Sequence, residues 1–302
     1  MVTSMLNSSP AIATTGRRRR LGLAAATVAA FLAMAASLPA AAAESAVPPR
    51  ESWTFWGPLG HYDRGQLQRG FKVYREVCAA CHSIKRIAFR NLSEAGGPGF
   101  TEGQVKALAE QYEVPGEPDD KGEVNPRKAR PADRFPLVYP NDNAARAANN
   151  GAVPPDLSLM GKARGVSAGF PWFIFDIFTQ YQEGGPDYIH ALLSHGYLDE
   201  TKGEKPPEGI TLAPGLHYNE YFPGHAIAMP KPLSDGQVEY TDGAPATVDQ
   251  YTRDVAAFLM WTSEPTLEAR KEMGLKVMIF LLIFTALLYY TKKKVWKAVE
   301  AH

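Results

Sequence analysis

The stretch "REVCAACHSI", residues 75–84, contains the only two cysteines of this 302-residue chain. Cys78 and Cys81 are separated by two residues, and His82 follows directly, which gives a C-x-x-C-H motif. In an exported protein this motif is typical of a covalently attached c-type haem. Two thioether bonds would hold the porphyrin, and the adjacent imidazole would lie under the iron.

Three other interpretations of the motif are weaker. A disulfide across so short a loop would constrain little chain entropy. A thioredoxin-type pair usually lies near a βαβ pattern, which does not flank this stretch. A structural zinc site needs four ligands, and the chain has no second cysteine pair and only His190 and His195 at the spacing of a zinc-binding histidine pair. The motif therefore predicts one haem c, provided that the chain is exported.

The N-terminus has the pattern of a secretory signal peptide. It carries the basic stretch "GRRRRLG", an apolar run over residues 21–38, and then "PAAAAES" with small residues at the cleavage site. Cleavage after Ala43 would remove residues 1–43. The alternative is an uncleaved anchor helix, against which the alanine-rich run and the cleavable site argue.

A second apolar run, near the C-terminus, predicts a membrane anchor. Residues 274–290 number 17 and contain one charge, Lys276. As a helix they would span roughly 25 Å. Four lysines follow the run, and such charges favour the cytoplasmic side. We therefore expect a transmembrane helix over 271–291, a cytoplasmic tail over 292–302 and a periplasmic haem domain over 44–270. A buried core helix is the alternative, which the flanking lysines disfavour.

The charges are segregated along the chain, although the formal net charge is zero. Only two of the 32 acidic residues lie outside residues 44–270, against ten of the 32 basic ones, so this region has a balance of −8. An acidic exported domain suits a basic protein partner, because long-range attraction speeds the encounter. Solubility alone explains the charge equally well. No basic stripe occurs in this region, so nucleic-acid binding is not indicated.

The hydrophobic pattern predicts a mostly α fold with long loops. Strand patterns are weak. Helical spacing is found in four segments: 65–82, 101–112, 184–197 and 247–261. The first helix should deliver the cysteines to the haem edge, Thr101 should cap the second, and the third should begin near Pro186. Segments 114–140 and 196–215 are rich in Pro and Gly and should be long loops around a buried haem.

The residues alone leave the second axial ligand of the iron open. Met260 lies beside a tryptophan in a predicted helix and suits packing, and Met273 lies at the membrane boundary. Met229 lies in "YFPGHAIAMPKPLSDG", a loop fixed by the proline that follows it. Met160, after a Pro-Pro turn, and the nearby His225 remain alternatives, because methionine and histidine both serve as axial ligands.

Four segments, in this order and before the C-terminal anchor, resemble the cytochrome c1 family of the alphaproteobacterial kind: "VCAACHS", "AARAANNGAVPPDLSLMGKAR", "NEYFPGHAIAMPKPL" and "RDVAAFLMWTSEP…RKEMGLKVMIFLL". The resemblance covers essentially the whole mature chain. It implies a cytochrome c-like mono-haem domain on one membrane helix. Cys78 and Cys81 would carry the haem, and His82 and Met229 would be its axial ligands.

The same resemblance implies further haem contacts. Four matching positions would form the wall of the haem pocket: Asn149, Ala152, Pro155 and Met160. Two others, Arg164 and Tyr188, would contact the haem propionates. A haem-ligating histidine also needs its other ring nitrogen hydrogen-bonded. We expect a backbone carbonyl near Pro155 to accept that bond from His82.

Residues 165–185, "GVSAGFPWFIFDIFTQYQEGG", depart from the mitochondrial pattern of the family as an insertion rich in aromatic residues. Some bacterial relatives close this region with a disulfide, for which no cysteine remains here. The apolar stretch "FPWFIFDIF" suits packing onto the domain or onto a neighbouring subunit, and we expect simple packing.

The resemblance implies one-electron transfer from a Rieske iron–sulfur protein to a soluble or tethered cytochrome c, in a dimeric bc1 complex with cytochrome b. The complex would be the enzyme, ubiquinol–cytochrome c reductase, and this chain a relay within it. Two alternatives are a free-standing membrane-anchored cytochrome that feeds a terminal oxidase, and a peroxidase-like haem enzyme with an open iron. Purification of the chain together with a cytochrome b and a Rieske subunit would exclude the first alternative. Binding of carbon monoxide to the reduced protein would test the second.

Overall fold

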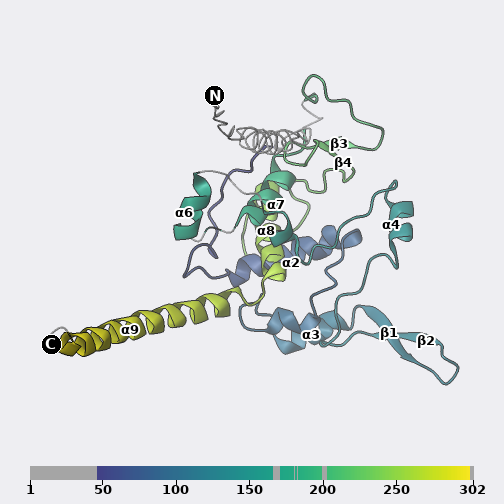
Figure 1. The fold of residues 1–302 in the computed structure, drawn as a ribbon. Coiled ribbons are helices and arrows are strands. Elements are labelled where there is room, and N and C mark those ends of the chain that lie inside the picture. Colours follow the sequence, from purple (N-terminus) through teal and green to yellow (C-terminus); the bar gives the residue numbers. More distant parts are fainter. Residues whose placement is uncertain (1–45, 166–170, 180, 182, 199–202, 300–302) are drawn as a thin grey trace, which may run out of the picture. The chain divides into compact units, whose positions relative to one another are not determined.

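The computed structural model describes residues 46–165, 171–179, 181, 183–198 and 203–299. The signal peptide predicted over residues 1–43 lies outside the described residues. The described fold is mostly α, as the sequence predicts, and Figure 1 shows its elements. In chain order they are α2 (Arg64–Glu76), η1 (Cys78–Ala80), η2 (Phe89–Ser93), α3 (Glu102–Ala109), β1 (Glu113–Pro118), β2 (Val124–Lys128), α4 (Asp142–Ala148), α5 (Met160–Ala163), α6 (Trp172–Thr179), α7 (Gly184–Ser194), β3 (His217–Tyr218), β4 (Ala226–Ile227), α8 (Val248–Ser263) and α9 (Leu267–Val299).

The core forms where α2 crosses α8, with α7 and α5 packed on the same helix α8. Gly70 permits the close crossing, because a Cβ at this position would collide with the main chain of Asp254. Phe71 and Tyr74 of α2 then lie against Phe258 of α8, with ring centroids 5.6 and 5.8 Å apart. Such aromatic pairs add to the free energy gained by burying their area.

The helix predicted over 247–261 forms as α8. Its sequence places Val248, Tyr251, Val255, Phe258 and Leu259 on one face. Val248 is half-buried and the other four are buried, which confirms this face as packed. Met260 is also buried, which confirms its packing role. The cap predicted at Thr101 is confirmed too, since its hydroxyl accepts from the main-chain N–H of Gln104.

Glycines also bring the short helix α5 against its neighbours. A Cβ at Gly161 would lie 2.7 Å from the Cα of Met260 on α8. A Cβ at Gly185, in the first turn of α7, would collide with the carbonyl oxygen of Gly161. The absence of side chains at these positions therefore lets α5, α7 and α8 meet at one point.

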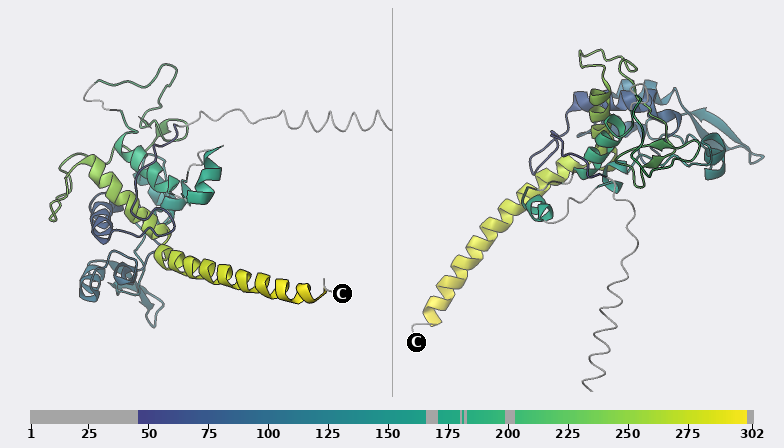
Figure 2. Two further views of the ribbon diagram at one scale, coloured as in Figure 1. Left: turned by 90° about the vertical axis from the view of Figure 1, so that its left-hand side faces the viewer. Right: turned by 90° about the horizontal axis from the view of Figure 1, so that it is seen from above.

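The loop predicted over 114–140 contains a hairpin that the sequence pattern did not reveal. Strands β1 and β2 pair antiparallel, with Pro115 opposite Pro126. Proline cannot donate to a ladder, so it usually argues against a strand, and an exposed two-stranded hairpin is where it is tolerated. The hairpin extends from the packed helices in both views of Figure 2.

Three apolar side chains of the aromatic insertion do not pack onto the domain, whereas packing onto a neighbouring subunit, the other option, stays a prediction. Trp172, Ile174 and Phe175 of α6 are 53, 38 and 55% exposed. Arg50 forms an ion pair with Asp176 at 2.8 Å and lies over the Trp172 ring. Among the described side chains of α6, Trp172 and Asp176 thus contact the preceding chain through Arg50.

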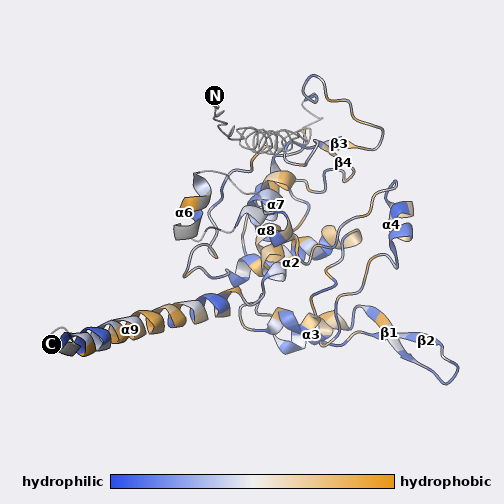
Figure 3. Ribbon diagram, viewed as in Figure 1, coloured by the Kyte–Doolittle hydropathy of each residue, from blue (hydrophilic) through white to orange (hydrophobic). Residues whose placement is uncertain are grey.

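The C-terminal helix is longer than the predicted 271–291. Helix α9 has 33 residues, and Leu267–Lys297 is long and apolar enough to cross a membrane. Figure 3 shows hydrophobic residues along its middle and hydrophilic residues at both ends. From Met273 to Trp296 the large apolar side chains of this helix are exposed, which a lipid environment accommodates and water does not.

Candidate haem-binding site

The C-x-x-C-H motif lies in one tight turn at the end of α2. The α-helix ends at Glu76, earlier than predicted, and the cysteines continue it as the 3-10 turn η1. The carbonyl oxygen of Cys78 accepts from the N–H of Cys81 at 3.1 Å and from that of His82 at 2.9 Å. Both cysteines are free thiols and half-buried, and burial raises the pKa of the Cys78 thiol to about 12. The turn therefore presents two thiols and an imidazole together.

The ring of His82 is fixed by the main chain of a distant segment. Its Nδ1 lies 2.8 Å from the carbonyl oxygen of Pro155, which confirms the predicted hydrogen bond. A carbonyl can only accept, so Nδ1 carries the proton and Nε2 keeps its lone pair. Burial lowers the pKa of His82. A neutral imidazole with a fixed tautomer is the form that ligates iron.

The segment after His82 is hydrogen-bonded to the segment after Pro155. The N–H of Leu157 donates to the carbonyl oxygen of Ser83 at 2.8 Å. The N–H of Lys85 donates to the Asp156 carboxylate at 2.9 Å, and that of Arg86 to the Ser158 hydroxyl at 3.1 Å. Sequence reasoning missed Asp156 and Ser158, although "PPDLS" carries the signal, because Asp and Ser readily bind nearby main-chain groups.

Asn149 and Ala152 belong to a turn that leads into this segment. Asn149 follows α4, and its carbonyl oxygen accepts from the N–H of Ala152 at 2.9 Å. Between them Asn150 and Gly151 have φ of 51° and 88°. The turn reverses the chain before Pro155, so the structure places these three predicted residues in one continuous loop.

Met160 and Arg164 lie at opposite ends of α5. Met160 is half-buried and packs against the core. Arg164 is exposed, and its charge acts on Tyr188 of α7. Burial raises the pKa of Tyr188, and the Arg164 guanidinium opposes this rise. The two residues predicted at the propionates therefore lie near each other.

Met229 follows strand β4 and is half-buried against the core. Its carbonyl oxygen accepts from the Tyr197 hydroxyl at 3.0 Å. Tyr197 in turn lies close enough to Tyr188 for the two phenols to interact electrostatically. His225, the competing ligand in this loop, stacks its ring on Tyr218 with centroids 5.6 Å apart.

Asn219 organises the loop that carries Met229. Its side chain is fully buried and donates to the carbonyl oxygen of Leu192 at 2.9 Å. Its side-chain oxygen accepts from the N–H groups of Tyr221 and Phe222 at 3.1 and 3.2 Å. Sequence reasoning missed Asn219 and Tyr197. The sequence "NEYFPG" does carry a turn signal at its asparagine.

These residues fit a covalently attached haem. Two thiols and a histidine with an available Nε2 share one turn, and a main-chain carbonyl sets the tautomer of the histidine. A mostly α domain with this motif defines the class: a c-type haem protein.

The comparisons identify the family within this class. The model of the Cytochrome C1 family matches residues 53–299, so the chain belongs to the cytochrome c1 family. "Cytochrome c1" of Blastochloris viridis is 49% identical over 267 residues, covering 88% of this chain and 92% of that protein. "Cytochrome c1" of Rhodospirillum rubrum is 44% identical over 261 residues, covering 83% and 88%.

A third relative is longer. "Cytochrome b/c1" of Bradyrhizobium diazoefficiens is 57% identical over 290 residues, which cover 95% of this chain but only 41% of that protein. Family membership and the exposed apolar helix α9 together make this chain a membrane-anchored haem protein of electron transport.

Proposed function

We propose that this chain is the one-electron relay of a cytochrome bc1 complex, between a Rieske iron–sulfur protein and a soluble or tethered cytochrome c. The observation that carries the proposal is the turn of Cys78, Cys81 and His82 with its hydrogen bond to the Pro155 carbonyl. The haem, when bound, supplies the one-electron chemistry. The complex is the enzyme, ubiquinol–cytochrome c reductase, and the chain itself performs no acid–base step.

The protein residues bind and tune the haem. Cys78 and Cys81 form the thioether bonds, and His82 and Met229 are the axial ligands. Ligation by histidine and methionine raises the redox potential, and two filled axial positions exclude small molecules from the iron.

The remaining predicted residues surround the same haem. Asn149, Ala152, Pro155 and Met160 form the pocket wall. Arg164 and Tyr188 bind the propionates, whose charge is costly to bury without partners. The electrostatic contact between Arg164 and Tyr188 supports this pairing.

We further propose the topology. Cleavage removes residues 1–43, residues 44–270 form the periplasmic haem domain, the membrane is crossed over 271–291 within α9, and residues 292–302 are cytoplasmic. The excess of lysine after the apolar run supports this orientation. The protomer belongs to a dimeric complex with cytochrome b in the inner membrane.

The tip of the hairpin β1–β2 supports the choice of a basic acceptor. Residues 117–123 are exposed and contain Glu117, Asp119, Asp120 and Glu123 against the single Lys121. The Asp119 carboxylate orders the tip, because it accepts from the N–H groups of Lys121 and Glu123, both at 2.9 Å. An acidic surface of this kind speeds the encounter with a cation.

The test uses the detergent-solubilised complex that contains the full chain. We expect it to contain a cytochrome b and a Rieske subunit, and to reduce a basic cytochrome c more slowly as salt rises. Screening is strong beyond about 10 Å at 0.1 M salt, so exposed charges lose their long-range attraction. A purified chain without these subunits would contradict the proposal, and a rate independent of ionic strength would remove the electrostatic part of it.

A further inference from the structure

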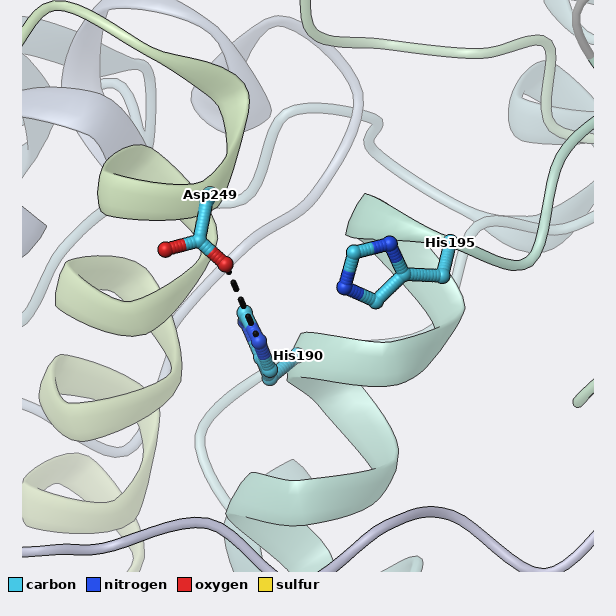
Figure 4. A group of neighbouring side chains, drawn as sticks. All are labelled: His190, His195 and Asp249. Carbon is cyan, nitrogen blue, oxygen red and sulfur yellow. Dashed lines mark ion pairs between the residues drawn. The ribbon is translucent and has the colours of Figure 1, made fainter.

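A second cluster of chemically active side chains, none of them among the predicted haem residues, lies where α7 meets the start of α8. His190 belongs to α7, His195 follows its last turn, and Asp249 lies in the first turn of α8 (Figure 4). One candidate ligand atom from each of the three lies within 4.8 Å of the others. Glu51, from the chain before α2, lies beside them.

His190 is fully buried, and its hydrogen bonds define which ring nitrogen is available. Its Nδ1 lies 2.8 Å from the Thr252 hydroxyl oxygen. That hydroxyl donates to the carbonyl oxygen of Asp249 at 2.9 Å, so it accepts from Nδ1. Nε2 therefore keeps its lone pair, and within the described part of the chain no hydrogen-bond partner reaches it.

Two carboxylate oxygens face this unpartnered nitrogen. His190 Nε2 lies 3.5 Å from Asp249 Oδ1 and 3.6 Å from Glu51 Oε1. Both distances exceed those of ordinary hydrogen bonds, about 2.7–3.2 Å. They match the separation of ligand atoms around tetrahedral zinc, about 3.3 Å for bonds of about 2.0–2.1 Å.

Arg253 holds the two carboxylates in this orientation through their other oxygens. Its guanidinium lies 2.7 Å from Glu51 Oε2 and 3.0 Å from Asp249 Oδ2. The oxygens that it leaves free are the two that face His190. With two carboxylates, one guanidinium and neutral imidazoles, the group carries a net charge of about −1, which suits a divalent cation.

We propose that His190, His195, Asp249 and Glu51 form a binding site for one zinc ion. His195 is exposed and lies with its ring centroid 5.8 Å from that of His190, so its imidazole can turn toward the ion. Two nitrogens and two carboxylate oxygens complete a tetrahedral set of ligands. Thr252 is the outer partner that fixes the tautomer of the buried ligand, as such sites require.

The ion would join three parts of the domain that are distant in sequence. Glu51 is already held near α7, because its N–H donates to the Asp187 carboxylate at 3.0 Å. Zinc would connect this segment to the end of α7 and the beginning of α8. Its binding would therefore stabilise the folded domain without altering the haem ligands.

The test is a zinc titration of the full-length haem-containing chain in detergent, in competition with a coloured chelator. We expect one tightly bound zinc ion, and no comparable binding of magnesium, which prefers oxygen ligands. His195→Ala should weaken zinc binding at least about tenfold, the scale of loss when even a residue supporting a ligand is removed. His61→Ala is the matched control, since it removes another exposed histidine outside the cluster.

X-ray absorption at the zinc edge supplies the second measurement. Two imidazole nitrogens should be present in the wild type and one fewer in the His195→Ala variant. An unchanged haem absorption spectrum verifies that each variant is folded. Equal zinc affinity of wild type and His195→Ala, or a zinc spectrum without imidazole, would overturn the site.

Discussion

The two sides of the proposed haem site are built in opposite ways. On the His82 side, the proposed ligand directly follows Cys81, and the main-chain carbonyl of Pro155 orients it. On the Met229 side, the proposed ligand lies in a loop ordered by the side chains of Asn219 and Tyr197. The first side depends on a local motif, whereas the second depends on contacts between residues far apart in the sequence. We therefore expect mutations to damage the second side separately from the first.

The largest effect should come from the cysteines on the His82 side. Cys78→Ala and Cys81→Ala should each impair covalent attachment of the haem, and the double variant should abolish it. Each substitution removes one of the two thioether bonds that hold the porphyrin. Haem staining of the full-length chain on a denaturing gel measures the result. A stained band from the double variant would refute the haem assignment.

The next effect should isolate the Met229 side. Met229→Leu should leave the haem attached while opening its sixth position. The redox potential should then fall by on the order of a tenth of a volt, since axial ligands set much of the potential of a haem. Carbon monoxide should bind to the reduced protein. A redox titration and a carbon monoxide difference spectrum measure both changes.

Met160→Leu is the matched control for this experiment. It also replaces a half-buried methionine, but one that we assign to the pocket wall. A swap of nearly equal volume usually costs less than about 1.5 kcal/mol. The variant should keep a six-coordinate, high-potential haem. If Met160→Leu opens the iron and Met229→Leu does not, the axial ligand is misassigned.

The smallest effect should come from a residue that supports the methionine without touching iron. Asn219→Ala leaves buried main-chain groups without partners, at about 1–3 kcal/mol each, so unfolding should become easier by about 3 kcal/mol. Because the loop carries Met229, a fraction of the protein should also bind carbon monoxide. Denaturant titration measures the free energy of unfolding. As a control, Asn143→Ala, at an exposed position in α4, should change neither this free energy nor the binding of carbon monoxide. Equal stability of the two variants would show that Asn219 does not order the loop.

Much of the fold follows from local sequence patterns. The spacing of Tyr251, Val255 and Phe258 predicted the buried face of α8, and Thr101 predicted the start of α3. Both are short-range effects, since amphipathic spacing and capping depend on residues within a few positions. The hydrogen bond of His82 was predictable because an iron-ligating imidazole needs such a partner.

The features that the sequence did not predict also have physical explanations. The hairpin β1–β2 pairs prolines that ordinarily exclude a strand. The apolar stretch of α6 suggested packing, but an apolar composition does not specify the surface against which it packs, and Trp172 and Phe175 are exposed. The roles of Asn219 and Tyr197 depend on contacts with distant residues, which no local pattern records. For Met229, the residues left several candidates, and only the family resemblance chose among them.

The acceptor that orients His82 has an evolutionary consequence, because it is a carbonyl of the main chain. Genetic change replaces side chains and leaves every carbonyl in place. A Pro155→Ala variant would still have the same carbonyl oxygen, so a substitution at this position preserves the acceptor that orients the His82 ring. The loop of Met229 has no such buffer, since a single nucleotide change can delete the sulfur, the Asn219 amide or the Tyr197 hydroxyl. The geometry on the Met229 side therefore persists only if selection removes variants that lose one of these three side chains.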